Sequence, residues 1–395
     1  MIVTEKRLNG QYGALHSAYW MLSGIVFGFT TVFLQSREYT NYEIGIIFAL
    51  GNIVGFVAQP LVAGIVDKSR KRALLPCILC TLALSLLLMT CVLFLPSACL
   101  PLSAAFVILL AGNILLQPLC ISLSFYIDSW GYRINFSAAR AIGSFSYALS
   151  SVVLGILVQR VSINAVPVSY IVITIVLGII TLLFTTQEKP YRSTSYGSID
   201  IQEKSSGLLE FITENKRFAL FLLGTSLLFF THSLIGNFMI EFVRNIGGNS
   251  ADLGNILAFM TLAEVPVMLL FSKLTRRFRC SSLMRFAVIM FTVKELAIYL
   301  SPSIPVLYAS EALQALSFAI FVPASVRYVD EVIVKRNSVK GQSYVTATIS
   351  LGSIFASFLG GMLLDRVGAS DTLLTGVLVS AVGTLVMLFA IQKTK

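Results

Sequence analysis

The longest polar segment of the chain, "TTQEKPYRSTSYGSIDIQEKSSGLLEFITENKR" at 185–217, decides how the sequence is organised. Its serine, glycine, lysine and glutamate content is typical of a mobile linker. On both sides of it, apolar runs follow one another, each long enough to cross ~30 Å of hydrocarbon as a helix of roughly 20 residues. The segment therefore divides the chain into two halves built from membrane-spanning helices.

The composition places the whole chain in the membrane. Of its 395 residues, 56% are hydrophobic and 12% are charged, and the mean hydropathy is +0.84. Soluble domains carry about a quarter charged residues, so an ordinary soluble protein is excluded. We expect an all-α, multi-pass integral membrane protein surrounded by a lipid bilayer.

Apolar windows separated by loop signals predict twelve transmembrane helices. A bundle of six helices is expected at 1–186, a cytoplasmic linker at 187–217, and a second bundle of six at 218–395. The predicted spans are 12–35, 42–66, 73–96, 102–128, 139–159, 166–186, 218–243, 252–272, 283–301, 303–326, 342–364 and 371–391.

The basic residues fix the orientation of these helices. With both termini in the cytoplasm, nearly every lysine and arginine falls in an inner loop, and the outer loops hold only Arg37, Arg160, Arg244 and Arg366. Cytoplasmic loops carry such an excess of positive charge. The net charge of +10 is explained by topology, and we expect no nucleic-acid partner. The first apolar run is too long for a cleaved signal peptide and is expected to remain as a helix.

The two halves carry traces of a repeat. "SSVVLGILVQRVS" (150–162) aligns without gaps with "ASFLGGMLLDRVG" (356–368), at the outer ends of matching helices. Short basic turns also follow the second helix of each half. Two parallel repeats of six helices are a transporter design in which the solute binds near the middle of the membrane.

The stretch "AGIVDKSRKR" (63–72) resembles the helix 2–3 loop of the major facilitator superfamily, G-x-x-x-D-R/K-x-G-R/K-R/K. Ala63 and Arg70 stand where that pattern has glycine. The resemblance implies alternating access between two six-helix bundles. It also implies a conformational latch formed by Asp67, Lys68, Lys71 and Arg72.

Within the superfamily, two stretches resemble the oligosaccharide/proton symporter branch that contains lactose permease, and its phenylpropionate-transporter relatives. "ARAIGSFSYA" (139–148) is similar to the start of that branch's fifth helix. The match implies that Arg140 binds solute, that Ser144 is the small residue beside it, and that Tyr147 is the stacking aromatic. "LAEVPVML" (262–269) is similar to the eighth helix, which implies a pair between Glu264 and Lys294.

The tenth helix departs from that branch. Lactose permease has lysine, histidine and glutamate at three-residue spacing, and "EALQALS" (311–317) puts Glu311, Gln314 and Ser317 at those places. The carboxylate has moved and the histidine is absent. The proton route of lactose permease therefore does not transfer unchanged.

Ionisable groups within spans mark substrate or ion paths by default. For proton coupling the candidates are Glu264, Lys294, Glu311 and His232. The Glu264–Lys294 pair could instead be purely structural, Glu311 could be a partly wetted residue near the vestibule, and His232 could be a core histidine. Glu295 lies one residue round the helix from Lys294 and does not share its face, and it could be an alternate partner or the outer contact of Lys294.

Further polar and aromatic residues are candidates for solute binding. Asn113 and Gln117 stand at i, i+4 and would present two amides to the cavity, unless they serve helix–helix hydrogen bonding. His16 and Trp20 share a face by the same spacing and could form an aromatic wall with Tyr147, or simply pack. The remaining candidates are Asn237 and Gln314.

These observations predict a transporter rather than an enzyme. We expect a monomeric, proton-driven symporter for a small-molecule solute in the inner (cytoplasmic) membrane of a bacterium, with no metal and no cofactor beyond the proton gradient. Sugars or oligosaccharides, nucleosides and aromatic carboxylates are the candidate solutes, in that order. An exporter of drugs or metabolites is the alternative, and a membrane enzyme or a sensor is a more distant one.

Overall fold

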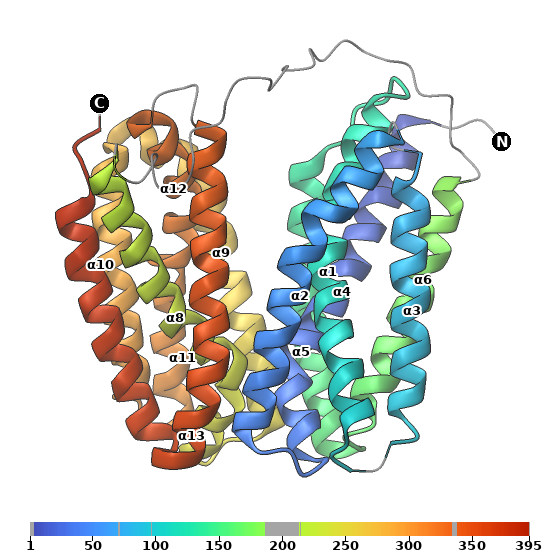
Figure 1. Ribbon diagram of the computed structural model, residues 1–395, viewed down its shortest axis with the longest axis horizontal. Helices are drawn as coiled ribbons and strands as arrows, with labels where there is room; N and C mark the ends of the chain where they lie inside the picture. The colour runs from blue at the N-terminus through green and yellow to red at the C-terminus, as the bar shows by residue number, and fades with distance from the viewer. Residues whose placement is uncertain are drawn as a thin grey trace. The chain divides into compact units, whose positions relative to one another are not determined.

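The computed structural model describes residues 4–69, 72–95, 97–185, 213, 215–333 and 338–394. The secondary structure of these residues is helical, with no strand among them (Figure 1). Contacts divide the chain into two compact units: unit 1 within Met1–Tyr39 and Ile47–Asp200, and unit 2 within Thr40–Ile46 and Ile201–Lys395. The predicted linker falls almost entirely outside the described residues.

The helices of unit 1 follow the predicted spans closely. The first helix begins earlier than predicted, because the side chain of Thr4 accepts a hydrogen bond from the Arg7 N–H and starts the helix in polar sequence. The elements are α1 (Glu5–Gln35), α2 (Asn41–Lys68), α3 (Leu74–Val92), α4 (Leu100–Asp128), α5 (Phe136–Arg160) and α6 (Ala165–Thr185).

The helices of unit 2 include two that are interrupted. The span predicted at 303–326 is divided by a short 3₁₀ turn, η1, and the last helix contains Gly368 with a φ of 80°, where only glycine is comfortable. The elements are α8 (Lys216–Asn245), α9 (Ser250–Arg277), α10 (Cys280–Tyr299), α11 (Ile304–Ala312), η1 (Leu313–Ala315), α12 (Phe318–Val332) and α13 (Ser338–Ala390).

Ten of the described helices are long and apolar enough to cross a membrane. In that count Ile304–Val332 is one span, and α13 is one span despite its break at Gly368. The count does not include α10, which carries Arg285, Lys294 and Glu295. Many large apolar side chains are exposed on the helix surfaces, as expected where lipid replaces water.

The first turn of α2 belongs to unit 2, where a carboxylate from α13 caps it. Asp365 accepts the backbone N–H of Asn41 at 3.1 Å and that of Tyr42 at 2.7 Å. The first N–H groups of any helix find no acceptor within the helix itself, and a negative charge there is stabilising. Gly361 allows the approach, since a Cβ atom at that position would lie 2.1 Å from the Asn41 carbonyl oxygen.

Candidate functional site

The predicted solute arginine of unit 1 lies on an aromatic ring. The guanidinium carbon of Arg140, on α5, is 3.9 Å from the ring centroid of Trp20, on α1. Arg140 also donates a hydrogen bond of 2.6 Å to the Ser144 hydroxyl, one helical turn away. The Trp20 ring N–H is buried and has no hydrogen-bond partner. The structure therefore brings the predicted residues Arg140, Ser144 and Trp20 into one cluster.

Two close helix contacts position this cluster. A Cβ atom at Gly143 would lie 2.3 Å from Cδ1 of Trp20, so only glycine lets the indole ring rest against α5. The ring of Tyr147, on α5, packs against Gly24 of α1, where an added Cβ atom would lie 3.3 Å from the ring. Tyr147 is half-buried. Tyr147, the predicted stacking aromatic, is thus packed against α1 and lies on the same helix as Arg140.

His16 lies deeper in the same helix pair and is 2% exposed. Its Nε2 is 2.8 Å from the Tyr12 hydroxyl, its ring meets Phe136 edge-on, and its Nδ1 has no hydrogen-bond partner. The sequence analysis missed Tyr12, although the i, i+4 spacing of Tyr12 and His16 was available to find it.

The two predicted amides of α4 do not share one environment. Asn113 is fully buried, and its side-chain oxygen accepts a hydrogen bond of 3.0 Å from Ser23 of α1. Its NH₂ group has no partner. Gln117 is exposed, one turn further along. The geometry of Asn113 matches the helix–helix alternative, because its oxygen is already used between helices.

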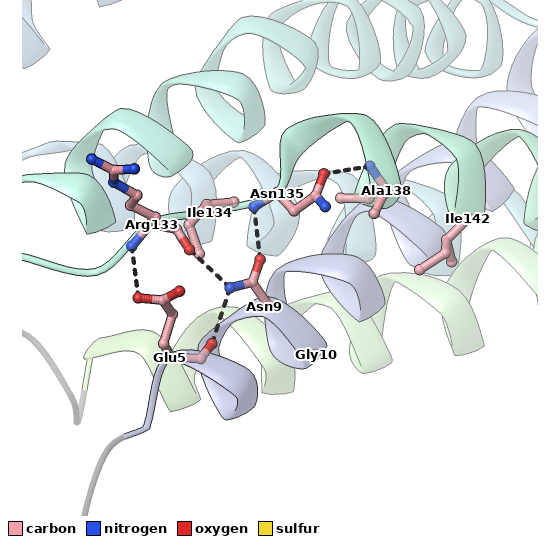
Figure 2. A pocket seen from close by; sticks show the side chains of 9 residues that line it. Glu5, Asn9, Gly10, Arg133, Ile134, Asn135, Ala138 and Ile142 are labelled. Atoms are coloured by element: carbon pink, nitrogen blue, oxygen red, sulfur yellow. Dashed lines mark hydrogen bonds between the residues drawn. The ribbon is translucent and has the colours of Figure 1, made fainter. Parts of the chain in front are cut away.

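A cavity of about 580 Å³ opens at the start of α1 and α5, and none of the predicted solute residues lines it. Figure 2 shows that Asn9 bridges the two elements across this cavity. Asn9 donates to the carbonyl oxygens of Glu5 and Arg133 and accepts the N–H of Asn135 at 2.7 Å. The Glu5 carboxylate accepts the N–H of Arg133. Because these polar groups are used in bonding to one another, we assign the cavity a structural role.

In unit 2 the ionisable residues form a buried chain of contacts. Lys294 of α10 lies 3.2 Å from the carboxylate of Glu311 on α11, with side chains 2% and 0% exposed. Lys294 also donates to the side-chain oxygen of Gln314 in η1. The NH₂ group of Gln314 in turn donates to Glu264 of α9 at 3.0 Å.

This arrangement bears on two readings of the sequence. The resemblance implied a pair between Glu264 and Lys294; the structure places the Glu311 carboxylate 3.2 Å from Lys294, and Gln314 connects Lys294 to Glu264. Glu311 is also not a wetted vestibule residue, because it is fully buried. The 3₁₀ turn explains the first difference, since it places Gln314 between the two helices that carry the charges.

The two polar residues predicted on α8 lie in different surroundings. His232 stacks on Phe318 with ring centroids 5.0 Å apart and meets Phe229 and Phe291 edge-on. The side-chain NH₂ group of Asn237 donates to the Ser357 hydroxyl of α13 at 2.9 Å. His232 therefore sits in an aromatic cage, and Asn237 joins two helices.

The predicted latch residues occupy the C-terminal end of α2 and the turn after it. Asp67 and Lys68 are exposed in the last turn of the helix, and the N–H of Arg72 bonds to the Ser69 carbonyl oxygen at 3.2 Å. Lys71 lies outside the described residues. Among the described residues, no group of three or more potential metal ligands gathers.

Comparison with known proteins gives one consistent result. Residues 13–375 match the model of the MFS_1 like family. The maltose permease of Geobacillus stearothermophilus is 25% identical over 94% of this chain and 92% of its own length. A protein of Deinococcus radiodurans named as a candidate sugar efflux transporter is 25% identical over 40% of each chain.

A solved structure supports the fold. A mutant form of the nucleoside transporter NupG superposes with a TM-score of 0.82 at 15% identity, over 98% of this chain and 100% of that one. The family match covers most of the chain, the relatives are membrane transporters, and the helices are arranged as in a solved transporter. The chain is a membrane transporter of the MFS_1-like family, within the major facilitator superfamily.

Proposed function

We propose that this transporter imports a small polar organic solute, a sugar or oligosaccharide or else a nucleoside, together with protons. The observation that carries the proposal is the Arg140–Trp20–Ser144 cluster. A guanidinium has five N–H donors in a fixed fork, and the unpartnered Trp20 N–H adds another. Donors beside an aromatic face suit a ring with a hydroxylated edge and an apolar face.

The name of the maltose permease favours a sugar, and the name of NupG keeps nucleosides as a candidate. Several further residues are proposed to contact the solute at some stage of the cycle. They are Tyr147, His16, Asn113, Gln117, Asn237 and Gln314.

The proton gradient is proposed as the energy source, with no other cofactor. Lys294, Glu311 and Glu264 are charged groups in the interior of a membrane protein, which mark ion paths by default. His232 is proposed to take part, since it lies close enough to Lys294 to interact with its charge. Asp67, Lys68, Lys71 and Arg72 are proposed as the conformational latch.

The proposed topology has twelve spans, counting α10 as one and each part of α13 on either side of Gly368 as one. Both termini are proposed to lie in the cytoplasm, with bundles at 1–186 and 218–395 and a linker at 187–217. The proposed location is the inner membrane of a bacterium, and the proposed state is a monomer. Cysteine labelling from either side of the membrane at positions 6 and 393 tests the orientation.

Export is the second candidate function, favoured by the Deinococcus radiodurans protein named for sugar efflux. Import of an aromatic carboxylate is also compatible with a guanidinium in the solute cluster, because the planar fork of arginine matches a carboxylate. The direction of the driving gradient separates export from import.

The test is uptake into proteoliposomes with an imposed pH gradient, acid outside. We expect labelled maltose or a nucleoside such as uridine to accumulate, and a protonophore to abolish the accumulation. Arg140→Lys keeps the charge but loses the planar fork, so we expect uptake to fall at least about tenfold. Phenylpropionate is the third solute. Failure of all three to enter contradicts the proposal, and accumulation only under the reversed gradient indicates export.

A further inference from the structure

Glu295 is a buried carboxyl group that none of the contacts described above uses. It lies on α10 beside Lys294 and is 1% exposed, and neither of its oxygens has a hydrogen-bond partner. Successive residues of a helix point about 100° apart. Glu295 therefore faces a different neighbour from Lys294.

The surroundings of Glu295 come from several elements. α10 packs against α8, α11, η1, α12 and α13. α12 contributes aromatic rings at this level, including Phe321 against Phe291. The polar and titratable groups near the pair Lys294–Glu295 are His232 of α8, Glu311 of α11, Gln314 of η1, and Ser380 and Thr384 of α13.

The hydroxyl groups on this face are paired with one another. Ser380 and Thr384 each lie 2.9 Å from the Thr292 hydroxyl, and Thr384 donates to the Val288 carbonyl oxygen. Ser380 is near enough to the Glu295 carboxyl to interact with it, but among the described residues no donor reaches hydrogen-bond distance and angle to either Glu295 oxygen.

The charges do not balance if every group is ionised. Lys294 supplies one positive charge, and it contacts Glu311 and donates to Gln314. Glu295 and Glu311 would supply two negative charges, and neither carboxyl group accepts a hydrogen bond; Glu311 differs because it lies 3.2 Å from the Lys294 ammonium group. An ionised carboxylate without hydrogen bonds in an apolar interior is so unfavourable that the group is neutralised instead. One proton on one of these two carboxyl groups leaves a single carboxylate beside the Lys294 ammonium group.

We propose that Glu295 is a proton-binding site of this transporter, neutral in the conformation described, while Glu311 is the ionised partner of Lys294. The use of that proton to drive uptake rests on the function proposed above. When the proton leaves Glu295 for water, a second carboxylate is left beside one ammonium group. Lys294 must then turn from Glu311 to Glu295, so proton release requires a rearrangement of the α10–α11 contact.

The first test compares two isosteric variants and needs no solute. Glu295→Gln imitates the neutral acid, so we expect a melting temperature within about 2 °C of the wild type. Glu311→Gln removes the anion that Lys294 contacts, so we expect a fall of roughly 5 °C or more. The reverse order, equal shifts, or a Glu295→Gln protein that does not fold would each overturn the proposal.

The second test detects the proton directly. In purified wild-type protein at about pH 8, well above the ordinary glutamate pKa of about 4.3, infrared spectroscopy should show the C=O stretch of a protonated carboxyl group. The band should be absent in Glu295→Gln and retained in Glu264→Gln. A wild-type spectrum without it contradicts the proposal, and so does a band that persists in Glu295→Gln.

The last test connects the site to transport. Glu295→Gln should still exchange labelled for unlabelled solute between equal concentrations, but should accumulate it at least about tenfold less against a gradient. Normal accumulation by Glu295→Gln would overturn the coupling role. Wild-type protein that moves none of the tested solutes would contradict the proposed function instead, and the melting and infrared results would still decide whether Glu295 holds a proton.

Discussion

Gly143→Ala is the sharpest perturbation of the Arg140–Trp20–Ser144 cluster, which is proposed to bind solute. The added Cβ atom would lie 2.3 Å from Cδ1 of Trp20, whereas ordinary contacts begin near 3.4 Å. The indole ring must therefore move by about 1 Å, away from a guanidinium that now lies 3.9 Å from its centroid. A desolvated cation–π contact contributes on the order of 0.5–2 kcal/mol. Since ~1.4 kcal/mol is tenfold in affinity, we expect solute binding to weaken about tenfold.

The assay is tryptophan fluorescence in a Trp130→Phe background. The chain has two tryptophans, so Trp20 alone then reports. Gly143→Ala should change the emission of Trp20 without solute, because the ring has left the guanidinium, and should raise the Kd for the solute found to be transported. Gly178→Ala is the matched control, since it also lies within a helix but its Cβ atom would meet nothing within 4 Å.

Both alanines gain about 1 kcal/mol of helix propensity over glycine, so that effect cancels in the comparison. Trp20 emission and affinity that match those of Gly178→Ala would refute the reasoning. The α1–α5 contact would then be loose enough to admit a methyl group, and Gly143 would not position the ring.

Three further predictions concern the other contacts. Lys294→Gln leaves Glu311 without its cation and should lower the free energy of unfolding by about 3–5 kcal/mol, measured by thermal unfolding. The Lys294→Gln/Glu311→Gln double variant should recover most of that loss. No recovery would mean that the pair does not interact. Asp365→Ala uncaps the first turn of α2 and should cost about 1 kcal/mol, seen as faster amide hydrogen exchange across Thr40–Ile46; unchanged exchange would contradict the cap. Asn9→Ala removes the bonds across the cavity of unit 1 and should expose the α4–α5 loop to limited proteolysis, while wild-type resistance would show that the bonds contribute little.

The spans could be predicted from sequence because the bilayer imposes a simple length rule on apolar runs. The ends of α2 and α4 fall within two residues of the predicted ends, because charged residues and proline mark the loops that follow and precede them. α11, η1 and α12 read as one continuous span in the sequence. Whether such a run stays regular depends on packing against its neighbours, which hydropathy does not report.

The partner of Lys294 could not be predicted for a related reason. Carboxylates occur at 264, 295 and 311, all inside apolar runs, and the sequence gives no rotation for the helices that carry them. The resemblance to lactose permease favoured Glu264, but the 3₁₀ turn at Leu313–Ala315 puts Gln314 in between. Arg140 and Trp20 were each predicted as solute residues but not as neighbours, and they meet because α1 and α5 pack directly on each other.

The contacts between α1 and α5 are spread along the length of both helices. Asn9 ties the start of α1 to the loop that leads into α5, the hydroxyls of Ser17 and Ser146 lie 2.6 Å apart further on, and Tyr147 rests against Gly24 beyond them. Because α1 and α5 are held together at three points along their length, we expect them to move as one body during transport. Under the proposed function this pair binds solute while the motion of the transport cycle takes place elsewhere, so side chains on it could be exchanged during evolution to admit a new solute without redesign of that cycle.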